Sequence, residues 1–225
     1  MKRLHVEAAV RSLAGLAIMC ALLFIPAGSL RWWQGWLLVV VFTLASSLIT
    51  VYLALRDPRL LERRLRAGPT AEKEPAQKRI MTVAMSGFVL LLVLPGLDRR
   101  YGWSQLPDGL ALLGDALVAL SFVVFYRVVR VNSSAAATVR VEEGQQVVST
   151  GPYAVVRHPM YAGVLPMVAG MPLALGSWWG MAPGMLVMLA LVRRLLHEER
   201  FLAQNLPGYA EYCRRVHYRL LPGVW

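Results

Sequence analysis

Charge is scarce in this sequence. Only 16% of its 225 residues are charged, whereas soluble domains average about 25%. Hydrophobic residues make up 57%, and the mean hydropathy is +0.50. Too few charged side chains are present to cover the surface of an ordinary soluble domain, so we expect much of the chain to face lipid.

Cysteine and histidine are scarce as well, which argues against disulfide and zinc cross-links. Cys20 lies in an apolar run and Cys213 near the end of the chain, so we do not expect them to pair. The four histidines lack the spacing of a zinc site, and no bound metal is expected. No small-residue cleavage site follows the first apolar run, so we expect no cleavable signal peptide.

Long apolar runs, in contrast, are abundant. Several approach the roughly 20 residues that a helix needs to cross a bilayer. We predict six membrane spans, at residues 12–30, 34–55, 80–97, 108–128, 160–176 and 178–195. The last two are short and contain Pro166, Pro172 and Pro183, so one or both are expected to be kinked or to cross incompletely. The predicted fold is therefore all-α, a polytopic integral membrane helical bundle with about five to six spans.

The basic residues are distributed unevenly. If the N-terminus is cytoplasmic and all six runs cross, 21 of the 24 Lys and Arg residues lie inside, and only Arg31, Arg99 and Arg100 lie outside. This is the positive-inside bias, so the net charge of +11 indicates topology, and no nucleic acid partner is expected. We expect a plasma (inner) membrane protein with cytoplasmic termini and active site, whose basic residues attract anionic lipid headgroups.

Residues 1–130 are predicted to form a scaffold of transmembrane helices. A segment near residues 57–67 differs, because Asp57 is suited to cap a helix that begins at Pro58. The leucines of this segment would share one face, opposite Arg and Glu, as in an interfacial amphipathic helix. They are Leu60, Leu61 and Leu65. The alternative is a solvated basic loop.

Residues 131–225 begin with the longest non-apolar stretch of the chain. Within it, residues 139–148 have a Glu-Gly turn signal between β-branched residues and are expected to form a short hairpin or an extended loop. The segment GPYAVVRHPMYAG follows at residues 151–163. Proline disfavours helix at the preceding residue and suits the first helical turn, so we expect a helix to begin at His158-Pro159.

The start of this helix is a candidate binding site. Its free N–H groups and positive dipole end favour an anionic group. Tyr153 and Tyr161 offer flat faces for a heterocycle or a cation. The alternative is an interfacial anchor, because Tyr and Arg are common at the edges of bilayers.

A second polar cluster, Arg193 to Glu199, ends the sixth run. Arg194 and Glu198 are four residues apart on one helix face, which by itself indicates an i, i+4 ion pair. If the fifth and sixth runs form a hairpin, the two clusters meet on one side of the membrane. The side chains that would then converge are Arg157, His158, Tyr161, Arg194 and Glu198.

Three motifs in this order resemble the isoprenylcysteine carboxyl methyltransferases, a family related to the membrane phospholipid methyltransferases. They are GPYAVVRHPMYAG at 151–163, RLLHEERFL at 194–202 and YAEY at 209–212. The resemblance covers about residues 138–225, and only the general membrane character matches before that. The sequence Leu206-Pro-Gly-Tyr209 departs from family members, which often have Phe-Gly and a slightly longer spacing.

The resemblance implies a methyltransferase with S-adenosylmethionine as cofactor and with residues 131–225 as its catalytic and cofactor region. By motif match, the cofactor-binding residues are Gln145, Gln146, Val147, Val148, Tyr153, His158, Pro159, Met160, Tyr161 and Glu198. Arg194 matches the catalytic, substrate-binding arginine that engages an acceptor carboxylate. No G-x-G-x-x-G motif follows a strand, so the soluble dinucleotide-type methyltransferase fold is not supported.

The expected acceptor is an amphiphilic, isoprenoid or lipid molecule from the bilayer, and a carboxylate is the first expectation. A carboxylate is already nucleophilic, so positioning, which can supply roughly 7–11 kcal/mol, would suffice. The alternatives are a phospholipid-type N-methyltransferase and a sterol-reductase-like membrane reductase that uses NADPH. A transporter or membrane-anchored interaction protein is disfavoured, because the span centres hold almost no charge.

Overall fold

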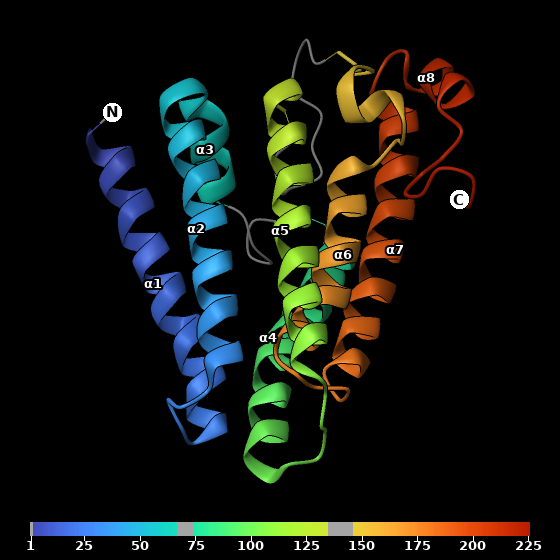
Figure 1. The fold of residues 1–225 in the computed structure, drawn as a ribbon. Coiled ribbons are helices and arrows are strands. Elements are labelled where there is room, and N and C mark those ends of the chain that lie inside the picture. Colours follow the sequence, from blue (N-terminus) through green and yellow to red (C-terminus); the bar gives the residue numbers. More distant parts are fainter. Residues whose placement is uncertain (1, 67–73, 135–145) are drawn as a thin grey trace.

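Figure 1 shows the computed structural model, which describes residues 2–66, 74–134 and 146–225. These ranges hold helices joined by turns and loops, and no β-strand occurs within them. The elements are α1 (Lys2–Ala27), α2 (Trp33–Arg56), α3 (Pro58–Leu65), α4 (Pro75–Tyr101), α5 (Asp108–Val131), the 3-10 turn η2 (Gly151–Ala154), α6 (Pro159–Ala174), α7 (Met181–Asn205) and α8 (Tyr209–Arg215). The predicted all-α membrane bundle is confirmed.

Within the described ranges, four helices, α1, α2, α4 and α5, are long and apolar enough to cross a membrane. Their apolar windows are only 17% to 33% buried by the rest of the chain, so most of their surface is left for lipid. α6 has 16 residues. Its length is about 24 Å at 1.5 Å per residue, less than a hydrocarbon core of about 30 Å. The fifth apolar run is thus the short segment that its sequence led us to expect.

Close helix crossings hold the bundle together. α5 packs along α6 and α4 along α7, while the α1–α2 hairpin lies against α4 and α5 (Figure 1). At the α5–α6 crossing, a Cβ atom on Gly114 would lie 2.2 Å from the Ala174 nitrogen and 2.5 Å from the Gly170 oxygen. Small residues allow this approach, and packing matters here because hydrophobic burial does not drive helix association in lipid. The crossing fixes α6, and with it the candidate site, against α5.

α3 follows α2 directly. The Leu60 N–H group donates a hydrogen bond of 3.0 Å to Asp57 Oδ1, which caps the helix, and Pro58 occupies its first turn. Leu60 and Leu61 are buried in a cluster with residues of α1, α2 and α5, and Leu65 lies at the edge of that cluster. This apolar face attaches α3 to the bundle, while its location at a membrane interface stays a prediction.

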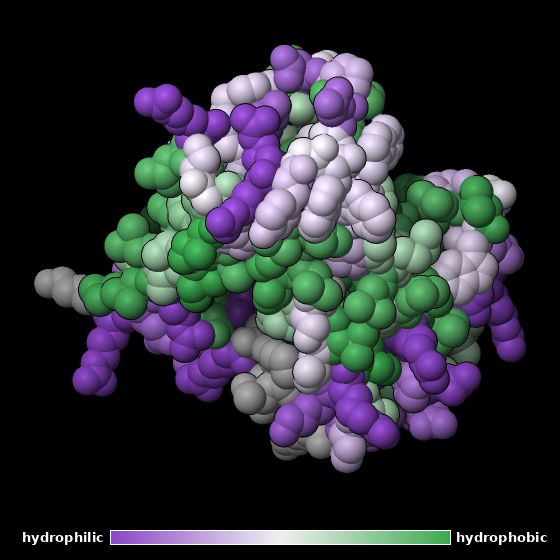
Figure 2. Space-filling model, turned by 90° about the horizontal axis from the view of Figure 1, so that it is seen from below, coloured by the Kyte–Doolittle hydropathy of each residue, from purple (hydrophilic) through white to green (hydrophobic). Residues whose placement is uncertain are grey.

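The two ends of the bundle differ. The N-terminus, α3, η2 and α8 lie toward one end, which we call the α8 end (Figure 1). Figure 2 views the molecule from the opposite end, where hydrophobic and intermediate residues lie beside hydrophilic ones. Tyr101, Trp103 and Trp179 are exposed, and Trp103 contacts each of the other two rings, as is typical of a bilayer interface. Nearby, buried Asp98 accepts hydrogen bonds of 2.7 and 2.6 Å from the N–H and hydroxyl groups of Ser104, which anchors the α4–α5 loop.

Candidate functional site

The site is built at the α8 end, where α6 begins. His158 is the N-cap residue, with φ −125° and ψ 64°, and Pro159 occupies the first turn, as the His-Pro pair predicts. No side-chain hydrogen bond from His158 caps the helix, and proline has no N–H group. The N–H groups of Met160 and Tyr161 therefore face the start of the helix, where the dipole favours an anionic group.

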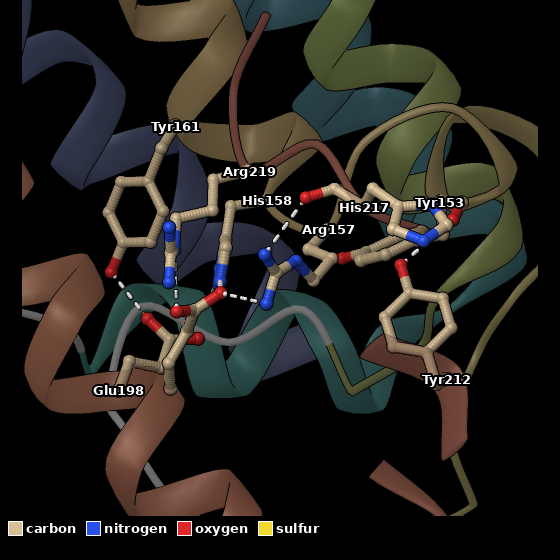
Figure 3. Close-up of polar contacts among 9 residues, drawn as sticks. Tyr153, Arg157, His158, Tyr161, Glu198, Tyr212, His217 and Arg219 are labelled. Carbon is tan, nitrogen blue, oxygen red and sulfur yellow. Dashed lines mark hydrogen bonds and ion pairs between the residues drawn. The ribbon is translucent and has the colours of Figure 1, made fainter. Parts of the chain in front are cut away.

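The hydroxyl group of Tyr161 joins α6 to α7. It donates to Glu198 Oε2 at 2.6 Å (Figure 3) and accepts from Arg194 Nε at 2.9 Å. Arg194 is only 4% exposed, and its Nη1 donates at 3.4 Å to Oε1 of Gln77 in the first turn of α4. The predicted convergence of Tyr161, Arg194 and Glu198 is found, with the tyrosine hydroxyl between the cation and the carboxylate.

Glu199 is the centre of a second group of contacts. Its Oε1 lies 2.9 Å from Arg157 Nη1 and 3.3 Å from His158 Nε2, and its Oε2 lies 2.7 Å from Arg219 Nε. Burial acts to raise the pKa of Glu199. The hydrogen bonds from His158 and Arg219 and the charges of His158 and Arg157 outweigh burial and lower the pKa to about 2. Glu199 is therefore ionised at neutral pH and holds two arginines and a histidine together.

The C-terminal segment packs against the residues that precede α6. The backbone N–H groups of Arg157 and His158 donate to the carbonyl oxygens of Tyr218 and Arg219, at 2.9 and 3.0 Å. Nη2 of Arg157 donates to the carbonyl oxygen of His217 at 3.0 Å (Figure 3). These contacts give the start of α6 a defined position relative to α7 and the tail.

Tyr153, on the turn η2, lies between the ends of α5 and α8. Its hydroxyl accepts from Asn132 Nδ2 at 2.7 Å, and its carbonyl oxygen accepts from the Tyr212 hydroxyl at 2.8 Å. Burial raises the pKa of Tyr153 to about 12, and the charge of Glu198 adds to this, while Asn132 and the charge of Arg64 oppose it. The hydroxyl is therefore neutral at pH 7.

The predicted cofactor-binding residues Gln145 to Val148 form a short segment, here called the strip, of which the structure describes the last three residues. Gln145 lies outside the described residues, as does most of the hairpin or loop expected at 139–148. Gln146 is exposed, and Val147 and Val148 are half-buried, in a stretch that is neither helix nor strand. Val147 packs at the edge of a buried cluster made by Leu206, Tyr209, Tyr212 and Val216. The strip thus passes beside α8.

The residues that contact the site and were not assigned from the sequence include Gln77, Asn132, Glu199 and Arg219. The sequence did contain a signal for Glu199. Adjacent residues of a helix point about 100° apart, so the neighbouring carboxylates of Glu198 and Glu199 are expected to contact different partners. For Gln77, the only signal is a polar side chain in the first turn of an apolar helix.

Fold and site together define an integral membrane helical protein with a polar site at one end of its bundle, formed where α6 begins and α7 nears its end. Residues 110–207 match the family of phospholipid methyltransferases, and this range covers the helices that carry Tyr161, Arg194 and Glu198. The match covers 98 of the 225 residues, and over this range it confirms the predicted relation to the phospholipid methyltransferases. No curated protein matches the chain.

Proposed function

We propose that the protein is an integral membrane, S-adenosylmethionine-dependent methyltransferase that methylates a carboxylate oxygen of an amphiphilic acceptor, as isoprenylcysteine carboxyl methyltransferases do. The observation that carries the proposal is the contact of Arg194, Tyr161 and Glu198 within the matched methyltransferase region. A buried cation and a carboxylate are held there on either side of one hydroxyl group. The cation of Arg194 suits an anionic acceptor, and the carboxylate of Glu198 suits the amine or hydroxyl groups of the methyl donor.

The chemistry of the groups around the start of α6 fits S-adenosylmethionine. Glu198 would accept hydrogen bonds from an ammonium or from ribose hydroxyls, and the N–H groups of Met160 and Tyr161 favour a carboxylate. Tyr153 and the strip at residues 146–148 offer aromatic and apolar surface to a heterocycle. When bound, the cofactor supplies a methyl group on a positively charged sulfur.

Arg194 is suited to hold the acceptor. A buried guanidinium suits polar or anionic partners, and an acceptor carboxylate would be attracted to its charge. Gln77 and Tyr161 position the guanidinium from two other helices. A carboxylate needs no general base, so these side chains would act by orientation, which can supply roughly 7–11 kcal/mol.

The family match favours a second acceptor, the amine of a phospholipid headgroup. An amine must lose a proton before it can accept a methyl group, and its ammonium form would be repelled by Arg194. The buried cation therefore favours the carboxylate, while the family favours the amine.

The two products differ in their stability to alkali, which gives a direct test. The purified protein in detergent micelles is incubated with a membrane lipid extract and S-adenosylmethionine carrying an isotope-labelled methyl group. We expect labelled lipid that releases labelled methanol in mild alkali, as a methyl ester does. Alkali-stable label in phospholipid would establish N-methylation instead, and the absence of label from every lipid fraction would contradict a lipid methyltransferase.

We propose that the α8 end faces the cytoplasm. The basic residues of α3 and α8 lie at this end (Figure 1), whereas Arg100 lies at the opposite end beside Gly28 of the α1–α2 turn. Cytoplasmic loops carry the excess of Lys and Arg in membrane proteins. Cysteine labelling with an impermeant reagent at position 211 and at position 29, in place of exposed Glu211 and Ser29, tests this orientation.

A further inference from the structure

Tyr209, the first residue of α8, is buried yet has no assigned role. It is 4% exposed and packs with Leu206, Tyr212 and Val216 in an apolar cluster. Gly208, with φ +81°, precedes it and turns the chain from the end of α7 into α8. The ring is therefore held by packing, and its hydroxyl group is carried to a fixed position.

Two buried polar atoms, Tyr209 Oη and Arg157 Nε, have no hydrogen-bond partner within the described part of the chain. A buried hydroxyl or guanidinium N–H group without a partner is unfavourable, and native proteins usually satisfy such groups. Because Arg157 Nε–H can only donate and the tyrosine O–H is a good donor, both suit an acceptor oxygen.

The charges around Tyr209 connect it to the proposed site. Burial raises the pKa of its hydroxyl, and the charges of Cys213, Glu199 and Glu198 add to this effect, whereas the charge of Arg157 opposes it. The hydroxyl therefore keeps its proton at neutral pH and lies within electrostatic range of both carboxylates that follow Arg194 in the motif.

We propose that Tyr209 Oη, together with Arg157 Nε, is a further contact for the carboxylate of the amino-acid end of S-adenosylmethionine, whose ammonium is assigned to Glu198. This inference rests on the proposed function. It gives the first tyrosine of the YAEY motif a binding role that its apolar packing alone does not require. It also places Leu206-Pro-Gly-Tyr209, the segment in which this sequence differs from the isoprenylcysteine carboxyl methyltransferases, next to the cofactor.

Tyr209→Phe tests the inference, because it removes the hydroxyl and keeps the ring in its cluster. Calorimetric titration with S-adenosylmethionine is expected to show about a tenfold weaker Kd, the effect of one hydrogen bond to a charged group. The thermal unfolding midpoint without ligand should stay the same or rise, since a buried hydroxyl without a partner is lost. Tyr218→Phe is the matched control, because Tyr218 is 41% exposed, and it should leave the Kd unchanged.

Titration with methylthioadenosine, which lacks the amino-acid end, locates the contact. The wild type and Tyr209→Phe should bind methylthioadenosine with the same Kd. An unchanged Kd of Tyr209→Phe for S-adenosylmethionine, or an equal loss with both ligands, would overturn the assignment while leaving the proposed function in place. If the wild type fails to bind S-adenosylmethionine, the proposed function and this inference fall together.

Discussion

Replacement of Glu199 by glutamine removes the charge at the centre of its cluster and keeps the shape of the side chain. In the wild type, this carboxylate contacts Arg157, His158 and Arg219 at 2.7 to 3.3 Å, and only 12% of its side chain is exposed. A neutral amide cannot balance the two guanidinium groups, one of which, that of Arg157, is 11% exposed. We therefore expect Glu199→Gln to loosen the tail and the start of α6 together.

The size of the effect follows from the pKa of Glu199, which is lowered from 4.5 to about 2 against the opposing effect of burial. A lowering of this size corresponds to about 3 kcal/mol in favour of the ionised form in the folded protein. Arg219 is 31% exposed, so solvent screens part of this attraction. We expect Glu199→Gln to reduce the free energy of unfolding by roughly 2 kcal/mol at pH 7.

Equilibrium unfolding in detergent micelles, followed by far-ultraviolet circular dichroism, measures this loss. Its pH dependence supplies a second check. Because the pKa of Glu199 is lowered on folding, its stabilisation is complete above pH 4.5 and is lost as the pH falls toward 2. The stability difference between wild type and Glu199→Gln should therefore be constant from pH 7 to 5 and shrink between pH 4.5 and 2.

Glu211→Gln is the matched control, because Glu211 also has an arginine partner but is 73% exposed. Its Oε1 lies 4.0 Å from Arg215 Nη2. We expect it to change stability by less than about 0.5 kcal/mol. The reasoning is refuted if Glu199→Gln is as stable as Glu211→Gln, or if the gap between wild type and Glu199→Gln does not depend on pH.

Two further predictions concern the bundle and the acceptor. Gly114→Ala should lower stability by about 1–3 kcal/mol, since its Cβ would lie 2.2 Å from a backbone nitrogen of α6 and overpacking carries this cost. Gly15→Ala, where no atom lies within 4 Å, should not lower it, and equal unfolding midpoints for the two variants would contradict the packing argument. Arg194→Gln should reduce turnover about 10–100-fold by removing charge-assisted hydrogen bonds to the acceptor, with the Kd for S-adenosylmethionine within about threefold of wild type. A selective loss of cofactor binding would instead place Arg194 on the cofactor.

Much of the fold follows from the sequence because lipid imposes simple constraints. Each apolar run predicted as a span coincides with the body of one helix, and the first four became the long helices α1, α2, α4 and α5. Pro159 set the start of α6, because a residue before proline is kept from helical geometry and proline suits the first turn. The two polar motifs then met because α6 and α7 pack side by side.

The parts that escaped prediction depend on contacts between distant residues. Gln77 and Arg194 are 117 positions apart, and no local pattern indicates that the first turn of α4 lies beside α7. The segment from His217 to Arg219 has neither helical nor alternating periodicity, so its pairing with Arg157 and His158 could not be read from hydropathy. The interactions of Glu199 likewise depend on the tail, which provides Arg219 as its partner.

Calorimetric titration of S-adenosylmethionine into the wild type and Glu198→Ala tests the central claim most directly. Glu198 accepts from Tyr161 at 2.6 Å and is the carboxylate assigned to the amine or hydroxyl groups of the cofactor. We expect saturable binding by the wild type and at least about tenfold weaker binding by Glu198→Ala, the loss of one charge-assisted hydrogen bond. No binding by the folded wild type, or equal affinity in the two proteins, would contradict the account.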